Sequence, residues 1–99
     1  MHAPAIFETW WQEVEQCSGQ AGDFAAVSWY YVPGAGSFVV GTDPEAVGLW
    51  QSSTNSITLA QAFREYAPVV RHEELHAILK RGDHPPEYFQ DKCGSIVAH

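Results

Sequence analysis

Two histidines four residues apart, with a glutamate directly after the first, form the pattern in this chain that could do chemistry: His72, Glu73 and His76. On a helix, residues four apart lie on one face, one turn apart, so both imidazoles could reach the same ion. Neutral imidazoles suit zinc, and a carboxylate beside an activated water is the general base of metal-assisted hydrolysis. The pattern therefore predicts a zinc site with Glu73 as the base.

The surrounding residues place this pattern on a helix over 67–81. Pro68 fits the first turn, where its missing N–H costs nothing, and Gly82 provides a stop. Four apolar residues would face the core: Val69, Leu75, Ile78 and Leu79. So short a pattern also occurs in helices that bind no metal, but this apolar context favours the metal site.

The run VVRHEELHAIL, preceded by a short alternating segment and a small linker, resembles the zincin clan of metallopeptidases. The resemblance covers about residues 48–92. It is greatest to minimal, secreted bacterial zincin-like proteins, in which a GDHP-like turn follows the helix. It implies an edge strand that leads into the zinc-binding helix, and zinc-dependent hydrolysis of peptide bonds.

A catalytic zinc is expected to have a third protein ligand beside a water molecule. Two zincin patterns for this ligand fail here. One takes a glutamate from a second helix downstream, but the only later glutamate, Glu87, is too near to belong to such a helix. The other has a glycine three residues and a histidine or aspartate six residues after the second histidine, where this chain has Leu79 and Gly82. The turn after the helix offers His84 or Asp83. We favour His84, for its imidazole and for the resemblance, and regard Asp83 as an acceptor for a ligand N–H.

The resulting mechanism has zinc held by His72, His76 and His84. A water molecule on zinc would have a pKa near 7, and Glu73 would take its proton and pass it to the leaving amine. His2 and His99 stand at the termini, and we expect neither to take part.

Two further parts of the site are predicted less directly. Tyr88, four residues past His84, is the candidate donor to the oxyanion, with Tyr30, Tyr31 and Tyr66 as alternatives. A peptide substrate would lie extended along the Ser56–Ala60 strand, which we expect at the edge of the sheet, and add to it through main-chain hydrogen bonds.

A non-catalytic protein is the alternative. The chain could be a zinc-stabilised binding module, or an inactive zincin relic, because 99 residues leave little room for a second wall of the cleft. The presence of Glu73 argues for catalysis, since a purely structural zinc needs no base.

Periodicity predicts a single α+β domain over residues 1–99, with two helices packed on one twisted four-stranded sheet. Residues 24–32 and 37–41 would form a hairpin around Pro33-Gly34, and 42–45 a turn or a single helical turn. The elements expected in chain order are a helix over 5–17, strands over 24–32, 37–41, 48–51 and 56–60, a helix over 67–81, and an irregular tail.

Charge and hydropathy limit the partners. Five Lys and Arg face twelve Asp and Glu, a net charge of -7, with no basic patch. We therefore expect neither nucleic acid nor an anionic membrane as a partner. No apolar stretch approaches the roughly 20 residues that span a bilayer. We also expect the protein to be a monomer.

The two cysteines, Cys17 and Cys93, allow one intramolecular disulfide, which would join the end of the first helix to the tail. Such a bridge in a small domain favours a secreted or periplasmic protein, although no secretory leader precedes the first helix. Two buried free thiols, or ligation of zinc by a cysteine, are the alternatives.

Overall fold

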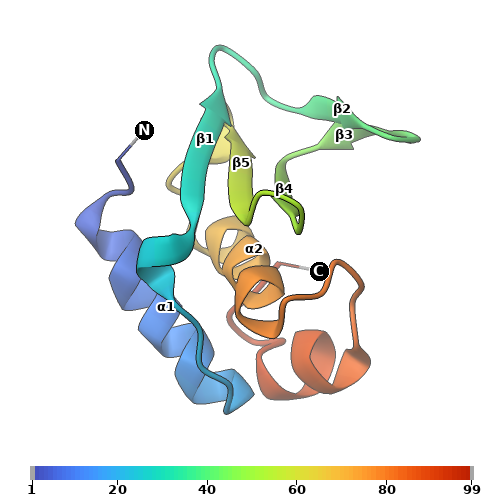
Figure 1. Cartoon of the computed structure of the whole chain (residues 1–99). Coiled ribbons are helices and arrows are strands. Elements are labelled where there is room, and N and C mark those ends of the chain that lie inside the picture. The colour runs from blue at the N-terminus through green and yellow to red at the C-terminus, as the bar shows by residue number, and fades with distance from the viewer. Residues whose placement is uncertain (1, 99) are drawn as a thin grey trace.

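The computed structural model describes residues 2–98 and shows a small α+β domain, as the sequence predicts. Helices α1 (Ala5–Ser18) and α2 (Ala67–Leu79) lie below the sheet in Figure 1. The strands are β1 (Ser28–Val32), β2 (Phe38–Val40), β3 (Asp43–Ala46), β4 (Gly48–Gln51) and β5 (Ser56–Ala60). Short helical turns η1 (Phe24–Ala26) and η2 (Gln61–Phe63) and a π-helical segment η3 (Glu87–Lys92) complete the fold. Among the described residues, no helix is both long and apolar enough to span a bilayer.

The strands form two sheets rather than the predicted four-stranded one. One sheet has the order β1-β5-β4, with β1 parallel and β4 antiparallel to β5, and the other is the hairpin β2-β3. The expected pairing of residues 24–32 with 37–41 is wrong. The reason is the turn after β1: the Gly34 N–H donates to the Gln61 side chain, and the Ala62 N–H donates to the Ala35 carbonyl. These bonds hold β1 beside β5, so β2 pairs with residues 43–46 instead. The turn predicted over 42–45 is therefore also wrong, because Asp43–Ala46 forms β3.

The prediction that Ser56–Ala60 is an edge strand is also wrong. β5 lies between β1 and β4, and only Thr58 of its five residues is not buried. The face that carries serine, threonine and alanine is also largely buried, with Ser56 3% and Ala60 0% exposed, so alternation in polarity does not produce alternation in exposure here. The free edge next to α2 belongs to β4, whose other side pairs with β5.

The core lies between the sheet and the two helices. α1 packs on α2, which in turn packs against β4 and β5. α2 ends at Leu79, two residues earlier than predicted, because Lys80 takes a left-handed conformation with φ 57°. The buried residues that cluster in this core are Phe7, Trp11, Val14, Val27, Trp29, Trp50, Ile57, Leu59, Val69, Val70, Leu75, Ala77, Ile78, Phe89, Cys93 and Val97.

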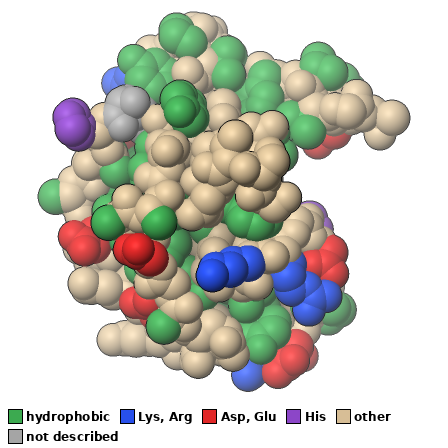
Figure 2. Space-filling model, viewed as in Figure 1, with side chains coloured by type: hydrophobic (Ala, Val, Ile, Leu, Met, Phe, Trp, Pro, Cys, Tyr) green, Lys and Arg blue, Asp and Glu red, His purple; other side chains and the backbone are tan. Residues whose placement is uncertain are grey.

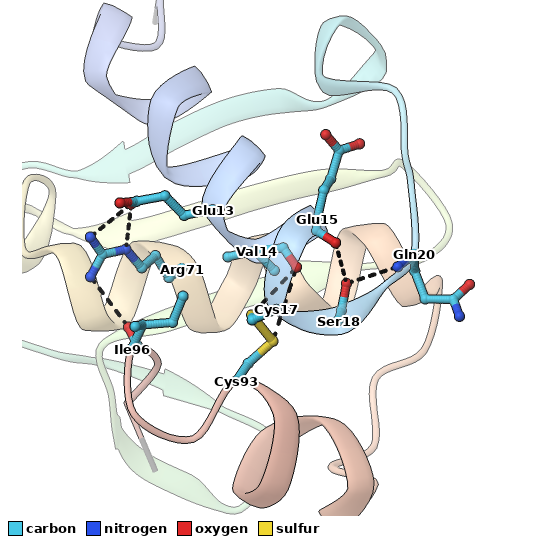
Figure 3. The surroundings of a disulfide bond; sticks show 9 residues. All are labelled: Glu13, Val14, Glu15, Cys17, Ser18, Gln20, Arg71, Cys93 and Ile96. Carbon is cyan, nitrogen blue, oxygen red and sulfur yellow. Dashed lines mark hydrogen bonds and ion pairs between the residues drawn. A yellow bond between two sulfur atoms is a disulfide. The ribbon is translucent and has the colours of Figure 1, made fainter.

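A disulfide joins the end of α1 to the residue after η3, and it confirms the predicted bridge. Cys17 and Cys93, 76 positions apart, have Cα atoms 5.3 Å apart. Figure 3 shows the bridge beside Arg71, which pairs with Glu13 at 2.9 Å and donates to the Ile96 carbonyl at 3.4 Å. The chain after α2 is therefore tied to both helices.

Replacing Cys17 and Cys93 by serine should lower the free energy of unfolding by roughly 4 kcal/mol, because the bridge closes a loop that spans most of the chain. Urea unfolding of metal-free protein measures the change. Wild-type protein in reductant should unfold at nearly the same urea concentration as the double variant. Equal midpoints for the variant and for the oxidised protein, with the bridge verified by intact mass, would contradict this prediction.

Candidate metal centre

Three histidines meet at one point beside α2. His72 and His76 lie one turn apart on the helix, and His84 is in the turn that leaves it. The Nε2 atom of His72 is 3.1 Å from that of His84 and 3.2 Å from that of His76. Ligands at the Zn–N distances of a tetrahedral site stand about 3.3 Å apart. The three side chains are therefore close enough to bind one metal ion.

The hydrogen bonds that His72 and His76 make through Nδ1 determine whether their Nε2 atoms, which face the centre, carry a proton. Nδ1 of His72 lies 2.6 Å from the Ala98 carbonyl oxygen, and Nδ1 of His76 lies 2.8 Å from that of Arg81. A carbonyl oxygen only accepts, so each Nδ1 carries the proton, and in the neutral form of each ring the lone pair is at Nε2. Two such lone pairs 3.2 Å apart cannot bond to each other and repel. A cation between them removes the repulsion, and this is the arrangement of metal-binding histidines.

The ionisation of His76 also suits a metal ligand. Burial lowers the pKa of His76 to about 4, more than its hydrogen bond to the Arg81 carbonyl raises it. The neighbouring His72 and His84 lower the pKa further. The imidazole of His76 is therefore neutral at physiological pH, the form that binds metal.

The structure separates the two candidates for the third ligand. Both carboxylate oxygens of Asp83 accept from Arg81, at 2.9 Å from Nε and 2.7 Å from Nη2. The same guanidinium lowers the pKa of Asp83. His84, in contrast, turns its ring toward the other two histidines, with centroids 5.0 Å and 4.8 Å away. The geometry therefore favours His84 as the ligand and leaves Asp83 in an exposed ion pair.

The terminal histidines are predicted to take no part. His2 lines a separate pocket with Phe24 and Tyr30 and is absent from the cluster of the described residues. His99 lies outside the described residues.

Glu73 stands beside this cluster, with 6% of its surface exposed. Burial raises its pKa to about 8, and a hydrogen bond from the Trp50 backbone N–H partly offsets that effect. The helix and β4 approach each other closely here: a Cβ atom at Gly48 would lie 2.9 Å from Cγ and Oε2 of Glu73. Gly48 therefore provides the space that Glu73 occupies, a role for which the sequence offered only a glycine at the start of a strand.

A cleft of about 450 Å³ opens over the histidines and Glu73. One wall consists of β4 and the β2-β3 hairpin, which projects from the body to the right in Figure 1. The other wall consists of α2 and the turn with His84. Figure 2 shows the hollow between the projecting arm and the body below it. The centre is thus reachable from solvent.

The adjacent Glu74 differs from Glu73 in its surroundings. It is fully buried, and its carboxylate oxygens have no hydrogen-bond partner within residues 2–98. Burial raises its pKa to about 9, although Arg71 lowers it. Glu74 is absent from the lining of the cleft, so of the two glutamates only Glu73 faces that space.

Tyr88 does not lie in this cleft. Its hydroxyl is 3.4 Å from the Gln20 side-chain amide, and Lys92 lies over its ring. Tyr30, Tyr31 and Tyr66 are also absent from the cleft lining. The structure therefore does not bring the predicted oxyanion donor, or any of its alternatives, to the metal centre.

Searches among known protein families, curated proteins and solved structures found no match to this chain. The function is therefore inferred from the fold and from the geometry of the metal centre.

His84→Ala should weaken zinc binding by more than 100-fold, because it removes one of three ligands. Asp83→Ala should weaken zinc binding by less than 10-fold. The loss of a group that supports a ligand costs about 10- to 100-fold, but Asp83 pairs with Arg81 at the surface instead. Competition with a chromogenic chelator measures both constants. A larger loss in Asp83→Ala would identify the carboxylate as the ligand.

Proposed function

We propose that the protein is a zinc-dependent peptidase with a minimal zincin-like site. The observation that carries the proposal is the convergence of three imidazole nitrogens in one cleft with the carboxyl group of Glu73. The resemblance of the α2 sequence to the zincin clan points to the same class of enzyme.

Zinc fits the donor set best. Three imidazoles with no carboxylate or thiolate are the ligands of a catalytic zinc that keeps one position open. Both cysteines are in the disulfide and are therefore excluded as ligands. When bound, zinc supplies Lewis acidity, which lowers the pKa of a water molecule to around 7 and polarises a carbonyl group.

Glu73 would act as the general base. It lines the cleft with His72 and His76, and the Trp50 N–H holds its carboxylate in place. The raised pKa of Glu73 is that of the metal-free protein. A dication held at the histidines would favour the ionised carboxylate of Glu73, which is the form that a base requires. Glu73 would accept the proton of the attacking water and deliver it to the leaving amine.

The substrate would be an extended peptide on β4 rather than on Ser56–Ala60. β4 is an edge strand of its sheet, and Gly48 to Trp50 line the cleft opposite the histidines, with the Trp50 N–H bonded to Glu73. A peptide that adds a strand to this edge would pass across the metal centre. The projecting β2-β3 hairpin would form the remaining wall.

The location proposed is an oxidising one, secreted or periplasmic. It is supported by the disulfide, because bridges of this kind persist outside reducing compartments.

A non-catalytic zinc module is the second candidate, and one observation favours it. Among the described residues that line the cleft there is no tyrosine, lysine or arginine. Peptidases of this kind stabilise the oxyanion with such a donor in addition to the metal. Activity without that donor would be correspondingly lower.

Glu73→Gln should retain zinc but reduce peptide hydrolysis by about 10²- to 10⁴-fold, the usual contribution of a general base. A fluorogenic peptide library, read with and without chelator, measures the rate, and elemental analysis measures the metal. Glu74→Gln is the matched control: the same change at the neighbouring buried residue should leave the rate of the folded protein within a few-fold. Undiminished hydrolysis in Glu73→Gln would contradict the mechanism, and metal binding without hydrolysis in the wild type would favour the module.

A further inference from the structure

One aromatic ring contacts all three histidines. The centroid of Phe89 lies 5.0 Å from that of His72, 4.8 Å from that of His76 and 5.0 Å from that of His84. Phe89 is 4% exposed and is absent from the cleft lining, whereas the three histidines line the cleft. The ring therefore lies on the side of the cluster that faces away from the cleft.

The three imidazoles differ in what fixes their orientation. His72 and His76 each hydrogen-bond through Nδ1 to a backbone carbonyl, at 2.6 Å and 2.8 Å. Within residues 2–98, the hydrogen-bond contact of His84 is through Nε2, toward His72. His84 is also the exposed member of the cluster. Packing on Phe89 is therefore the contact that orients His84 from outside the cluster.

Phe89 is itself held firmly. It lies on η3, where its N–H donates to the Pro85 carbonyl at 3.0 Å. Four residues later, Cys93 is bonded to Cys17 on α1, and its N–H donates to the Tyr88 carbonyl at 2.9 Å. The same short segment thus carries the third histidine, the ring beneath the cluster and the covalent anchor.

We propose that Phe89 is a positioning residue of the metal centre: it holds the three imidazoles in the arrangement that binds the ion and closes the side away from the cleft to water. The inference rests on the proposed zinc site and goes beyond its ligands. A flat ring packs against several imidazoles at once, so it limits their rotation without occupying a ligand position. Preorganised ligands bind with less loss of conformational freedom.

The experiment compares Phe89→Ala and Phe89→Leu with Phe7→Ala and Phe7→Leu. Phe7 is a matched control because it is also a buried phenylalanine, and it packs against Trp10 and Trp29 rather than the histidines. Zinc affinity is measured by chelator competition, the visible spectrum of the cobalt-loaded protein reports ligand geometry, and circular dichroism in chelator reports the folded fraction.

Phe89→Ala should weaken zinc binding by 10- to 100-fold, the range for groups that orient ligands, and should alter the cobalt spectrum. Phe89→Leu, which keeps apolar volume, should show a smaller loss. The Phe7 variants should keep wild-type affinity and spectrum wherever they are folded. If Phe89→Ala does not fold, Phe89→Leu is compared with Phe7→Leu. Zinc affinity should then fall at least threefold in Phe89→Leu and stay unchanged in Phe7→Leu.

Equal affinities and spectra in the Phe89 and Phe7 variants, with zinc bound normally by the wild type, would overturn this inference and leave the zinc site intact. A wild-type chain that binds no zinc would overturn the proposed function as well. The two failures are therefore distinguishable.

Discussion

The repulsion between imidazole lone pairs is the constraint on which the rest of the structure depends. Two rings whose Nδ1 atoms must carry the proton point their Nε2 atoms at each other from 3.2 Å, and a third ring joins at 3.1 Å. The approach of the His72 and His76 lone pairs is unfavourable in a metal-free protein and must be maintained by neighbouring contacts. A metal ion converts the same arrangement into a favourable one, which is why preorganisation of this kind indicates a binding site.

The maintaining contacts come largely from the chain after α2. The Arg81 and Ala98 carbonyls orient two histidines, and the Phe89 ring packs under all three. The disulfide to α1, and the hydrogen bond from Arg71 to the Ile96 carbonyl, tie this segment to the helices. A domain of 99 residues has a small core. The covalent anchor therefore supports the stability of the fold and the geometry of the site together.

Local signals made part of this structure predictable. The helix of residues 67–79 follows from apolar spacing and a proline at its start, and His72, Glu73 and His76 follow from their spacing on it. The Cys17–Cys93 pairing follows because two cysteines allow one bridge. His84 could be named as a candidate because it lies in the turn after the helix, and its imidazole and the resemblance favoured it over Asp83.

The features that depend on distant contacts were not predictable. The hairpin partner predicted for β1 is wrong because side-chain and backbone bonds from Gly34 and Ala35 to residues after β5 decide the pairing. The edge position predicted for β5 is wrong because small polar side chains look exposed in a sequence, yet Ser56 is buried. The roles of Gly48, Phe89 and the Ala98 carbonyl arise from close approaches between segments far apart in the chain, which periodicity does not encode.

X-ray absorption spectroscopy of the zinc-loaded protein tests the central claim most directly, because it counts the imidazole ligands of the metal itself. The account predicts about one zinc per chain, with three imidazole nitrogens and one oxygen ligand at about 2.0 to 2.1 Å. A chain that binds no zinc, or a bound zinc with two imidazoles or fewer, would contradict it.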